Sequence, residues 1–194
     1  MGGVVDRTIE RERVERLPAR RLVPAVVWFT GLPGSGKSTI ARRVCSELSG
    51  AGVPVECLDG DEIRSLFPGT GFTRPEREAH IRRVGFLASR LERHGVTVVA
   101  ALVSPYRESR AFARSLCQRF VEVYVATPLE ECERRDPKGL YARARRGEIS
   151  NLTGVGDPFE VPEQPEITID TREIAVDQAV SRIMERLNAA GAAD

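Results

Sequence analysis

The fold is decided by the stretch AVVWFTGLPGSGKST, residues 25–39. Residues 25–29 form a short apolar run, which is typical of a strand buried on both faces. Residues 31–38 match the pattern G-x-x-x-x-G-K-S, and apolar residues recur at helical spacing over residues 37–49. A strand, a glycine-rich loop and a helix in this order predict a loop whose backbone N–H groups and helix N-terminus bind phosphate.

Two residues of this loop have expected side-chain roles. Lys37 is expected to bridge the β- and γ-phosphates of ATP, and the Ser38 hydroxyl is expected to ligate Mg²⁺. Of the 29 basic residues only Lys37 and Lys138 are lysines, and Arg does not replace Lys at a tight phosphate site. We expect Lys37 to face solvent, with its charge unpaired until nucleotide binds. The residues expected to bind ATP are Gly31, Leu32, Pro33, Gly34, Ser35, Gly36, Lys37, Ser38 and Thr39.

Strand and helix patterns alternate along the rest of the chain. We predict further strands over 53–58, 96–103, 120–126 and 167–170. We predict further helices over 74–94, 106–118, 128–135, 138–146 and 173–189. This alternation predicts an α/β fold, a parallel sheet of the P-loop NTPase type with helices on both faces. Ligands of such a sheet bind beyond the carboxyl ends of the strands, which are Gly31, Asp59, Ser104 and Thr127.

The charge balance argues against a nucleic-acid or membrane partner. The 194 residues include 29 basic and 28 acidic side chains, which leaves a net charge of +1. A near-neutral protein has no global field to hold nucleic acid or an anionic membrane. No apolar run is long enough to span a bilayer, and the charge-rich N-terminus lacks the apolar segment of a signal peptide. We therefore expect a cytoplasmic protein.

The cysteines do not form a metal-binding pattern. Cys45, Cys57, Cys117 and Cys132 include no C-x-x-C pair, and the chain has only two histidines. A structural zinc site needs clustered ligands. We expect all four cysteines to be reduced thiols in the core.

Two carboxylates follow the second predicted strand, in Leu58-Asp59-Gly60-Asp61. A phosphoryl acceptor needs a group that orients its hydroxyl and takes its proton, and Mg²⁺ prefers oxygen ligands. We assign Asp61 to the acceptor hydroxyl and Asp59 to the metal and its water shell. The alternative for Asp61 is a structural role as the cap of a helix that begins at Glu62. Ser104, at the end of the third strand, is a further candidate, and its alternative is likewise a helix cap.

Cationic and aromatic side chains follow these carboxylates. Arginines concentrate here, at Arg64, Arg74, Arg77, Arg82 and Arg83. Arg74, Arg77 and Arg82 cannot all share one helical face, so some must be solvated. A second anionic ligand would need one or two of them as clamps, and Phe72, in a loop, could stack on a base. The charged helix predicted around Lys138 and the loop after it, which is rich in Gly and Pro, resemble a lid over residues 137–166.

At this point the chain resembles the adenylylsulfate kinase family, whose members phosphorylate the 3′-hydroxyl of adenosine 5′-phosphosulfate with MgATP. The resemblance covers about residues 25–187. Besides the phosphate loop it rests on motifs in the family's order: Leu58-Asp59-Gly60-Asp61, Ile63-Arg64, Gly71-Phe72-Thr73, Arg77, Ile81-Arg82-Arg83, Val103-Ser104-Pro105, Arg134, Asp136, Lys138-Gly139-Leu140-Tyr141, Arg143-Ala144-Arg145, Gly147-Glu148-Ile149 and Thr153-Gly154.

The resemblance implies roles for several of these residues. Phe72 would stack on the substrate adenine, while Arg64 and Arg77 would hold the phosphosulfate. Arg143 would lie in the lid over ATP. The family pattern gives the serine matching Ser104 as a phosphorylated intermediate, but we place Ser104 in the substrate pocket because no base is evident beside it. The residues expected to bind the acceptor are Asp59, Asp61, Arg64, Phe72, Arg77, His80, Val103, Ser104, Pro105, Lys138 and Leu152, and the expected catalytic set is Lys37, Asp61 and Ser104.

We expect a P-loop kinase domain over residues 23–190, preceded by a charge-rich arm over 1–22. The resemblance also implies a homodimer. The chain departs from the family where Ala79-His80-Ile81-Arg82-Arg83 replaces the usual Glu-Asn-Ile-Arg-Arg, and where Leu152 replaces an aromatic residue before Thr-Gly. Imidazole gains a charge near pH 6.5. If His80 touches an anionic acceptor, the acceptor KM should therefore rise between about pH 6 and pH 8.

The sequence also bears on three other functions: a paralogous kinase, a nucleotide-binding module without turnover and a shikimate-type kinase. The departures at His80 and Leu152 favour a paralogous kinase that phosphorylates another nucleotide-like alcohol. A nucleotide-binding module without turnover would lack Lys37, Ser38 or both carboxylates, and this chain has them all. Shikimate-type kinases need a Gly-Gly-Gly substrate loop, which this chain does not contain.

Overall fold

The computed structural model describes residues 22–67 and 70–189. The charged arm predicted over residues 1–22 lies, apart from Leu22, outside the described residues. No helix among residues 22–67 and 70–189 is long and apolar enough to cross a membrane.

The five described strands form one sheet in the order β2-β3-β1-β4-β5, and each neighbouring pair is parallel. They are β1 (Val26–Thr30), β2 (Val55–Asp59), β3 (Thr97–Ala101), β4 (Phe120–Val125) and β5 (Ile167–Ile169). Because every strand runs in the same direction, the chain must return outside the sheet after each one. The α/β prediction from the alternating patterns is confirmed, and each predicted strand is present with ends shifted by a few residues.

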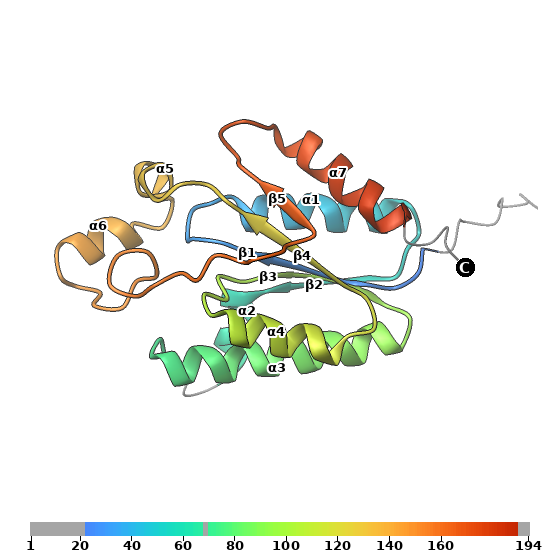
Figure 1. The fold of residues 1–194 in the computed structure, drawn as a ribbon, viewed down its shortest axis with the longest axis horizontal. Coiled ribbons are helices and arrows are strands. Elements are labelled where there is room, and N and C mark those ends of the chain that lie inside the picture. The colour runs from blue at the N-terminus through green and yellow to red at the C-terminus, as the bar shows by residue number, and fades with distance from the viewer. Residues whose placement is uncertain (1–21, 68–69, 190–194) are drawn as a thin grey trace, which may run out of the picture.

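Helices cover both faces of this sheet (Figure 1). On one face lie α1 (Lys37–Gly50) and α7 (Val176–Ala189); on the other lie α3 (Arg74–Arg93) and α4 (Arg107–Leu116). Side chains alternate along β1, so that Val27 and Phe29 pack in the core under α1 and α7, while Val26 and Trp28 pack in the core under α3. Because both cores are apolar, β1 reads as a continuous apolar run in the sequence.

Three short helices lie near the carboxyl ends of the strands: α2 (Gly60–Leu66), α5 (Leu129–Arg135) and α6 (Leu140–Arg145). At the start of α2 the cap is Asp59, whose carboxylate accepts from the Asp61 backbone N–H at 3.0 Å. The alternative in which Asp61 caps a helix beginning at Glu62 is therefore wrong. Since the cap lies two residues earlier, the Asp61 side chain is free for another partner.

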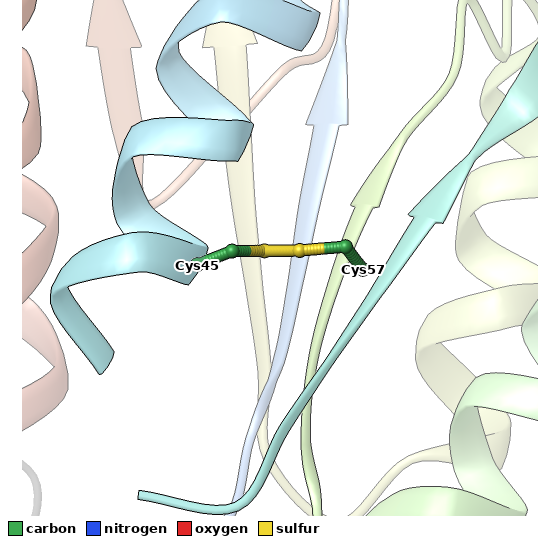
Figure 2. Close-up of a disulfide and its surroundings, with 2 residues drawn as sticks. All are labelled: Cys45 and Cys57. Carbon is green, nitrogen blue, oxygen red and sulfur yellow. A yellow bond between two sulfur atoms is a disulfide. The ribbon is translucent and has the colours of Figure 1, made fainter. Parts of the chain in front are cut away.

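Cys45 on α1 and Cys57 on β2 are joined by a disulfide, with their Cα atoms 6.5 Å apart (Figure 2). The expectation of four reduced core thiols is wrong for this pair, and Cys57 is exposed on the sheet edge. The spacing of 12 residues carried no signal, because the pairing arises only when α1 packs back across β2. The free cysteines of the described residues are Cys117, which is partly buried, and Cys132, which is buried.

The disulfide predicts that two of the four cysteines carry free thiols. Protein unfolded without reductant should react with a thiol reagent at Cys117 and Cys132 only. Because a cross-link restricts the unfolded chain, reduction should lower the free energy of unfolding by about 2–4 kcal/mol. A Cys45→Ser/Cys57→Ser variant is the control, since reductant should leave its denaturation midpoint unchanged. Four reactive thiols in the unreduced wild-type protein would contradict the pairing.

Candidate active site

The glycine-rich loop between β1 and α1 depends on residues without a Cβ. Gly31 has φ +146°, and a Cβ there would lie 2.5 Å from the carbonyl oxygen of Val125 at the end of β4. Gly36 has φ +101°, a conformation that L side chains rarely adopt, and its missing Cβ would lie 3.2 Å from Thr171 Cγ2. The loop therefore curls tightly over the ends of β4 and β5, as a phosphate cradle requires.

Two threonines hold this loop from the sheet. Thr127, just beyond β4, donates its hydroxyl to the Ser35 carbonyl at 3.0 Å, and Thr171, beyond β5, donates to the same oxygen at 3.2 Å. Arg135 on α5 in turn donates to the Thr171 hydroxyl at 2.7 Å. The sequence interpretation noted Thr127 only as a strand end and missed Thr171 and Arg135. The only signal for Thr171 was its place directly after the last predicted strand.

Lys37 is the first residue of α1, and only 8% of it is exposed. Its ammonium group donates to the Leu32 carbonyl at 2.7 Å and to Ser35 Oγ at 3.4 Å. The expected solvent-facing, unpaired lysine is therefore wrong: the curled loop folds over its own cation. Burial lowers the pKa of Lys37 from 10.5 to about 8, against the opposing effect of nearby acidic groups. An anion in the loop would restore the favourable environment for this charge.

Ser38 and Asp59 meet beside Lys37. The Ser38 hydroxyl donates to Asp59 Oδ2 at 3.2 Å, while Asp59 Oδ1 caps α2. A hydroxyl and a carboxylate are the hard oxygen ligands that Mg²⁺ prefers, and Mg²⁺ at phosphate sites takes few protein ligands. The residues present therefore fit this ion.

Asp61 is the second residue of α2. Its carboxylate contacts the ammonium group of Lys138, which lies in the segment between α5 and α6. Both side chains are largely exposed, so this pair is screened by solvent and easily exchanged for another partner. One of the two lysines thus pairs with Asp61, while the charges of Asp59 and Asp61 also act on Lys37 by raising its pKa against the effect of burial. The pair of Asp61 and Lys138 joins residues 77 apart in the sequence.

A cationic and aromatic cluster lies next to α2. Phe72 is 52% exposed, and the guanidinium groups of Arg64 and Arg77 lie 4.6 and 5.6 Å from its ring centroid. Burial and then the charge of Arg77 lower the pKa of Arg64. Two adjacent cations beside an exposed aromatic face suit a ligand that is both anionic and planar.

Arg77 is the one arginine of the predicted group that the fold buries, at 7% exposed. It donates to the Phe72 carbonyl at 2.7 Å, to the Asn151 carbonyl at 2.6 Å and to the Thr153 hydroxyl at 2.8 Å. Arg77 therefore ties α3 to the segment that follows α6. The sequence argument that some of these arginines must be solvated is confirmed by exposed Arg74, Arg82 and Arg83.

Ser104 follows β3 in an unusual conformation, with φ +38°. Its hydroxyl accepts from the indole N–H of Trp28 at 3.1 Å, and only 2% of the residue is exposed. It does not cap α4, whose N-cap is Tyr106. Val103, beside it, accepts from the Thr30 hydroxyl at 2.8 Å, which fixes the end of β3 against β1. The carbonyl of Pro105 accepts from the Glu160 N–H at 2.8 Å.

His80 lies on the buried face of α3 and is 1% exposed. Neither ring nitrogen has a hydrogen-bond partner within the described ranges. Burial and then the charge of Arg64 lower the pKa of His80 from 6.5 to about 4. The expected change of charge between pH 6 and pH 8 is therefore wrong, because His80 stays neutral over that range.

The segment carrying α6 docks onto the phosphate loop. Tyr141 is 1% exposed, and its hydroxyl donates to the Pro33 carbonyl at 2.9 Å. Leu152, 7% exposed, belongs with Tyr141 and Cys132 to a small core of its own. Arg143, which was expected in the lid over ATP, contacts Glu148 at 3.3 Å within the same segment. Tyr141 was quoted in the sequence motifs but not assigned to the site, and a helical tyrosine gave no signal of this contact.

One cavity beside the loop holds none of the predicted acceptor residues. It has a volume of about 560 Å³ and lies between Leu32, the end of β4 around Thr127, and residues 154–161. Asp61, Phe72 and Ser104 do not line it. The candidate acceptor side is thus the exposed cluster around Phe72 rather than this cavity.

Comparisons with known proteins identify the family. The family model described as adenylylsulphate kinase matches residues 23–170. An adenylyl-sulfate kinase from Synechococcus sp. (strain JA-2-3B'a(2-13)) is 48% identical over 166 residues, which cover 85% of this chain and 95% of that relative. The solved APS kinase of Mycobacterium tuberculosis, in complex with AMPPNP and APS, has a TM-score of 0.82 at 38% identity and covers 85% of this chain and 98% of that one. A hexameric APS kinase from Thiobacillus denitrificans has a TM-score of 0.66 at 34% identity, covering 89% of this chain and 30% of that one.

The low pKa of His80 predicts a specific acid sensitivity. Between pH 6.5 and about 4 the unfolded chain binds a proton at this residue that the folded protein rejects, so stability is lost as pH falls through that window. The loss is about 1.4 kcal/mol per pH unit at most. Denaturation at pH 7 and pH 4.5 should show a smaller acid loss in His80→Asn than in wild type. His94→Asn, at the exposed histidine, is the control and should follow wild type; equal acid losses in all three would contradict the buried, neutral imidazole.

Proposed function

The chain belongs to the adenylylsulphate kinase family, and from that premise we propose how its residues transfer the γ-phosphoryl group of ATP to the 3′-hydroxyl of adenosine 5′-phosphosulfate. The product is 3′-phosphoadenosine 5′-phosphosulfate. The match covers nearly the whole length of the relative from Synechococcus, so the activity applies to a chain of this size. The roles assigned to individual residues below are proposals.

The observation that carries the proposal is the arrangement of the two lysines and the two carboxylates. Lys37 lies under a loop that is preformed by glycines, and its desolvated charge favours the β- and γ-phosphates of ATP. Asp59 and Asp61 begin the neighbouring helix, where an acceptor hydroxyl and a metal-bound phosphate would meet. Phosphoryl transfer to an alcohol needs a cation at the phosphates and a group that takes the proton of the hydroxyl, and these residues supply both.

Ser38 and Asp59 are the residues that would hold Mg²⁺. Their oxygen atoms are within 3.2 Å of each other, so both can contribute to one coordination shell, directly or through water. When bound, the ion supplies neutralisation of the charge on the transferring phosphate oxygens. The chain's own cations, Lys37 and Lys138, add to that neutralisation from either side.

The acceptor is proposed to bind against Phe72, with Arg64 and Arg77 on its phosphosulfate group. The exposed ring offers a stacking face for adenine, which is worth about 1–3 kcal/mol per base. Arg77 also fixes residues 151–153, so acceptor binding and the position of Leu152 are linked. His80, neutral and buried behind Arg64, is proposed to shape the pocket rather than to carry charge.

Asp61 is proposed to orient the 3′-hydroxyl and take its proton as the phosphoryl group arrives. Its exposed pairing with Lys138 leaves the carboxylate available once the acceptor binds. Ser104 is proposed to line the pocket with Val103 and Pro105, because its hydroxyl already accepts a hydrogen bond from Trp28 and no base lies beside it among its described contacts. Transfer is then direct and needs no phosphorylated serine.

The remaining roles concern closure and assembly. We assign residues 23–190 to the kinase domain and residues 137–166 to a lid that excludes water from the phosphoryl group, with Arg143 reaching ATP when the lid closes. Tyr141 docks this lid on the phosphate loop. The homodimer and the cytoplasmic location stay predictions from the sequence; the solved relative from Thiobacillus denitrificans is a hexamer.

Transfer from γ-labelled ATP tests the function directly. Purified protein with Mg²⁺ and adenosine 5′-phosphosulfate should place the label on the 3′-oxygen, and other 3′-hydroxyl acceptors should be poorer. Lys37→Ala should lose more than about nine-tenths of kcat, because the phosphate charge then has no partner, while its circular dichroism stays that of wild type. Label transfer only to a different alcohol would contradict the acceptor, and an active Lys37→Ala would contradict the loop assignment.

Replacing Asp61 separates catalysis from nucleotide binding. Asp61→Asn should lower kcat by about 10²–10⁴-fold, with little change in the KM for ATP, because the lost interaction belongs to the acceptor hydroxyl. Glu62→Gln, which removes one exposed carboxylate at the next residue, is the matched control and should keep the wild-type kcat. If both variants keep it, the proton acceptor is another group.

A further inference from the structure

Ser104 holds a backbone conformation that needs support. A residue with a Cβ is disfavoured at φ +38°. Two donors converge on it: the Trp28 indole reaches its hydroxyl at 3.1 Å, and Arg110 reaches its carbonyl oxygen at 2.7 Å. The Thr30 hydroxyl, which donates to Val103 O at 2.8 Å, lies 3.3 Å from the same carbonyl oxygen. Two buried donors therefore hold this one residue just beyond β3.

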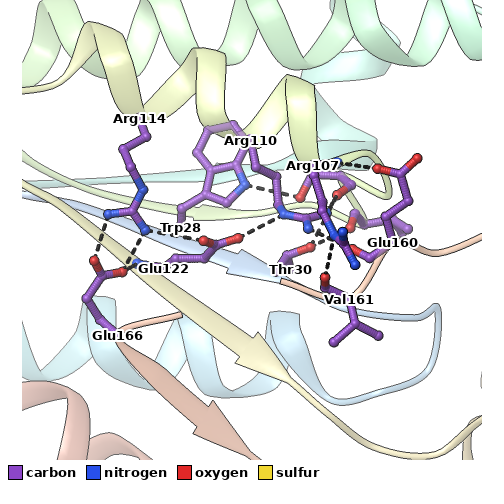
Figure 3. Close-up of polar contacts among 11 residues, drawn as sticks. Trp28, Thr30, Arg107, Arg110, Arg114, Glu122, Glu160, Val161 and Glu166 are labelled. Carbon is purple, nitrogen blue, oxygen red and sulfur yellow. Dashed lines mark hydrogen bonds and ion pairs between the residues drawn. The ribbon is translucent and has the colours of Figure 1, made fainter. Parts of the chain in front are cut away.

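Arg110, on α4, also contacts Glu122 on β4 and Glu160 in the loop before β5 (Figure 3). Its Nη1 donates to Ser104 O, its Nη2 donates to the Glu160 carbonyl at 2.6 Å, and its Nε contacts Glu122 Oε1 on β4 at 2.8 Å. Only 3% of Arg110 is exposed. The three nitrogen atoms of one guanidinium group thus contact three different parts of the chain. A lysine ammonium group cannot make three such contacts in one plane.

Stability alone does not explain this buried charge. Glu122 is 7% exposed and lies in the middle of a central strand, where an apolar residue would pack at least as well. The ion pair continues outward to Arg114 and Glu166, at 3.2 and 2.6 Å (Figure 3). Glu122 lies against Nε of Arg110, and the two Nη groups donate to the two carbonyls.

The second carbonyl, that of Glu160, belongs to the part of the proposed lid that leads from α6 back to β5, which we call the return limb. Glu160 also donates its own N–H to Pro105 O at 2.8 Å, and its carboxylate accepts from the Arg107 N–H at 2.8 Å. Glu160 is therefore hydrogen-bonded to Pro105, the residue after Ser104. Arg110 adds a second link, because it donates to the carbonyls of both Ser104 and Glu160.

We propose that Arg110 is a positioning residue that sets the lid's return limb against Ser104, so that the lid closes in register with the acceptor pocket and keeps water from the phosphoryl group. This rests on the proposed function of Ser104 and of residues 137–166. Arg110 itself touches no substrate. Its loss acts through Ser104 O and Glu160 O, on acceptor binding and on water exclusion.

The test compares Arg110→Lys with Arg114→Lys. Lysine at position 110 keeps the charge opposite Glu122 but cannot serve both carbonyls. We expect the acceptor KM to rise about tenfold, as small displacements of positioned groups do, with the KM for ATP nearly unchanged. Hydrolysis of ATP per acceptor phosphorylated should also rise, because a poorly seated lid admits water. Arg114→Lys weakens the same ion-pair chain without touching either carbonyl, so both quantities should stay at wild-type values.

A second variant covers a failure of Arg110→Lys to fold. Arg110→Met/Glu122→Met removes both buried charges together, a replacement that buried pairs often tolerate, and it should show the same rise in acceptor KM and in uncoupled hydrolysis. Wild-type values of both quantities in a folded variant at position 110, or equal changes in Arg114→Lys, overturn the inference while leaving the function intact. A wild-type protein that does not phosphorylate adenosine 5′-phosphosulfate overturns the proposed function and the inference with it.

Discussion

The contact between the ends of β1 and β4 is the constraint on which the site depends. The two strands approach so closely at Gly31 that no side chain fits beside the Val125 carbonyl. The chain can therefore turn at once into the loop, whose Ser35 carbonyl is then within reach of Thr127 and Thr171. The proposed phosphate site follows from this turn, because α1 starts where the loop ends and presents its N-terminus to the same space.

The two sides of the site differ in how far they are organised without ligand. The loop is closed around Lys37, whose ammonium group is already held by backbone and hydroxyl oxygens. The acceptor side instead exposes Phe72 and leaves Asp61 in a solvated pair. The charge at the donor phosphate is therefore preorganised, whereas the groups on the acceptor side exchange their partners when a ligand binds.

Several features of this site were predictable because they depend on short-range patterns. The loop residues and Ser38 follow the buried strand β1, and both carboxylates come at the end of β2. Parallel strands bring their carboxyl ends to one edge. Features that join distant residues were not predictable: the Cys45–Cys57 disulfide, the hydroxyls of Thr171 and Tyr141, and the buried pair of Arg110 and Glu122. Nothing in a charged residue on a predicted helix distinguishes one that is solvated from one that is buried.

The sequence by itself determined the strand, loop and helix that bind phosphate, the parallel α/β fold and the family. These depend on local periodicity and on glycines that only a curled backbone requires. The tertiary structure decided which charges are buried and what they hold: it folded the loop over Lys37, made Asp59 the helix cap in place of Asp61, and left His80 neutral. The physical reason is that burial and partnership depend on which elements pack together across the sheet, and a residue's surroundings in space cannot be read from its neighbours in the chain.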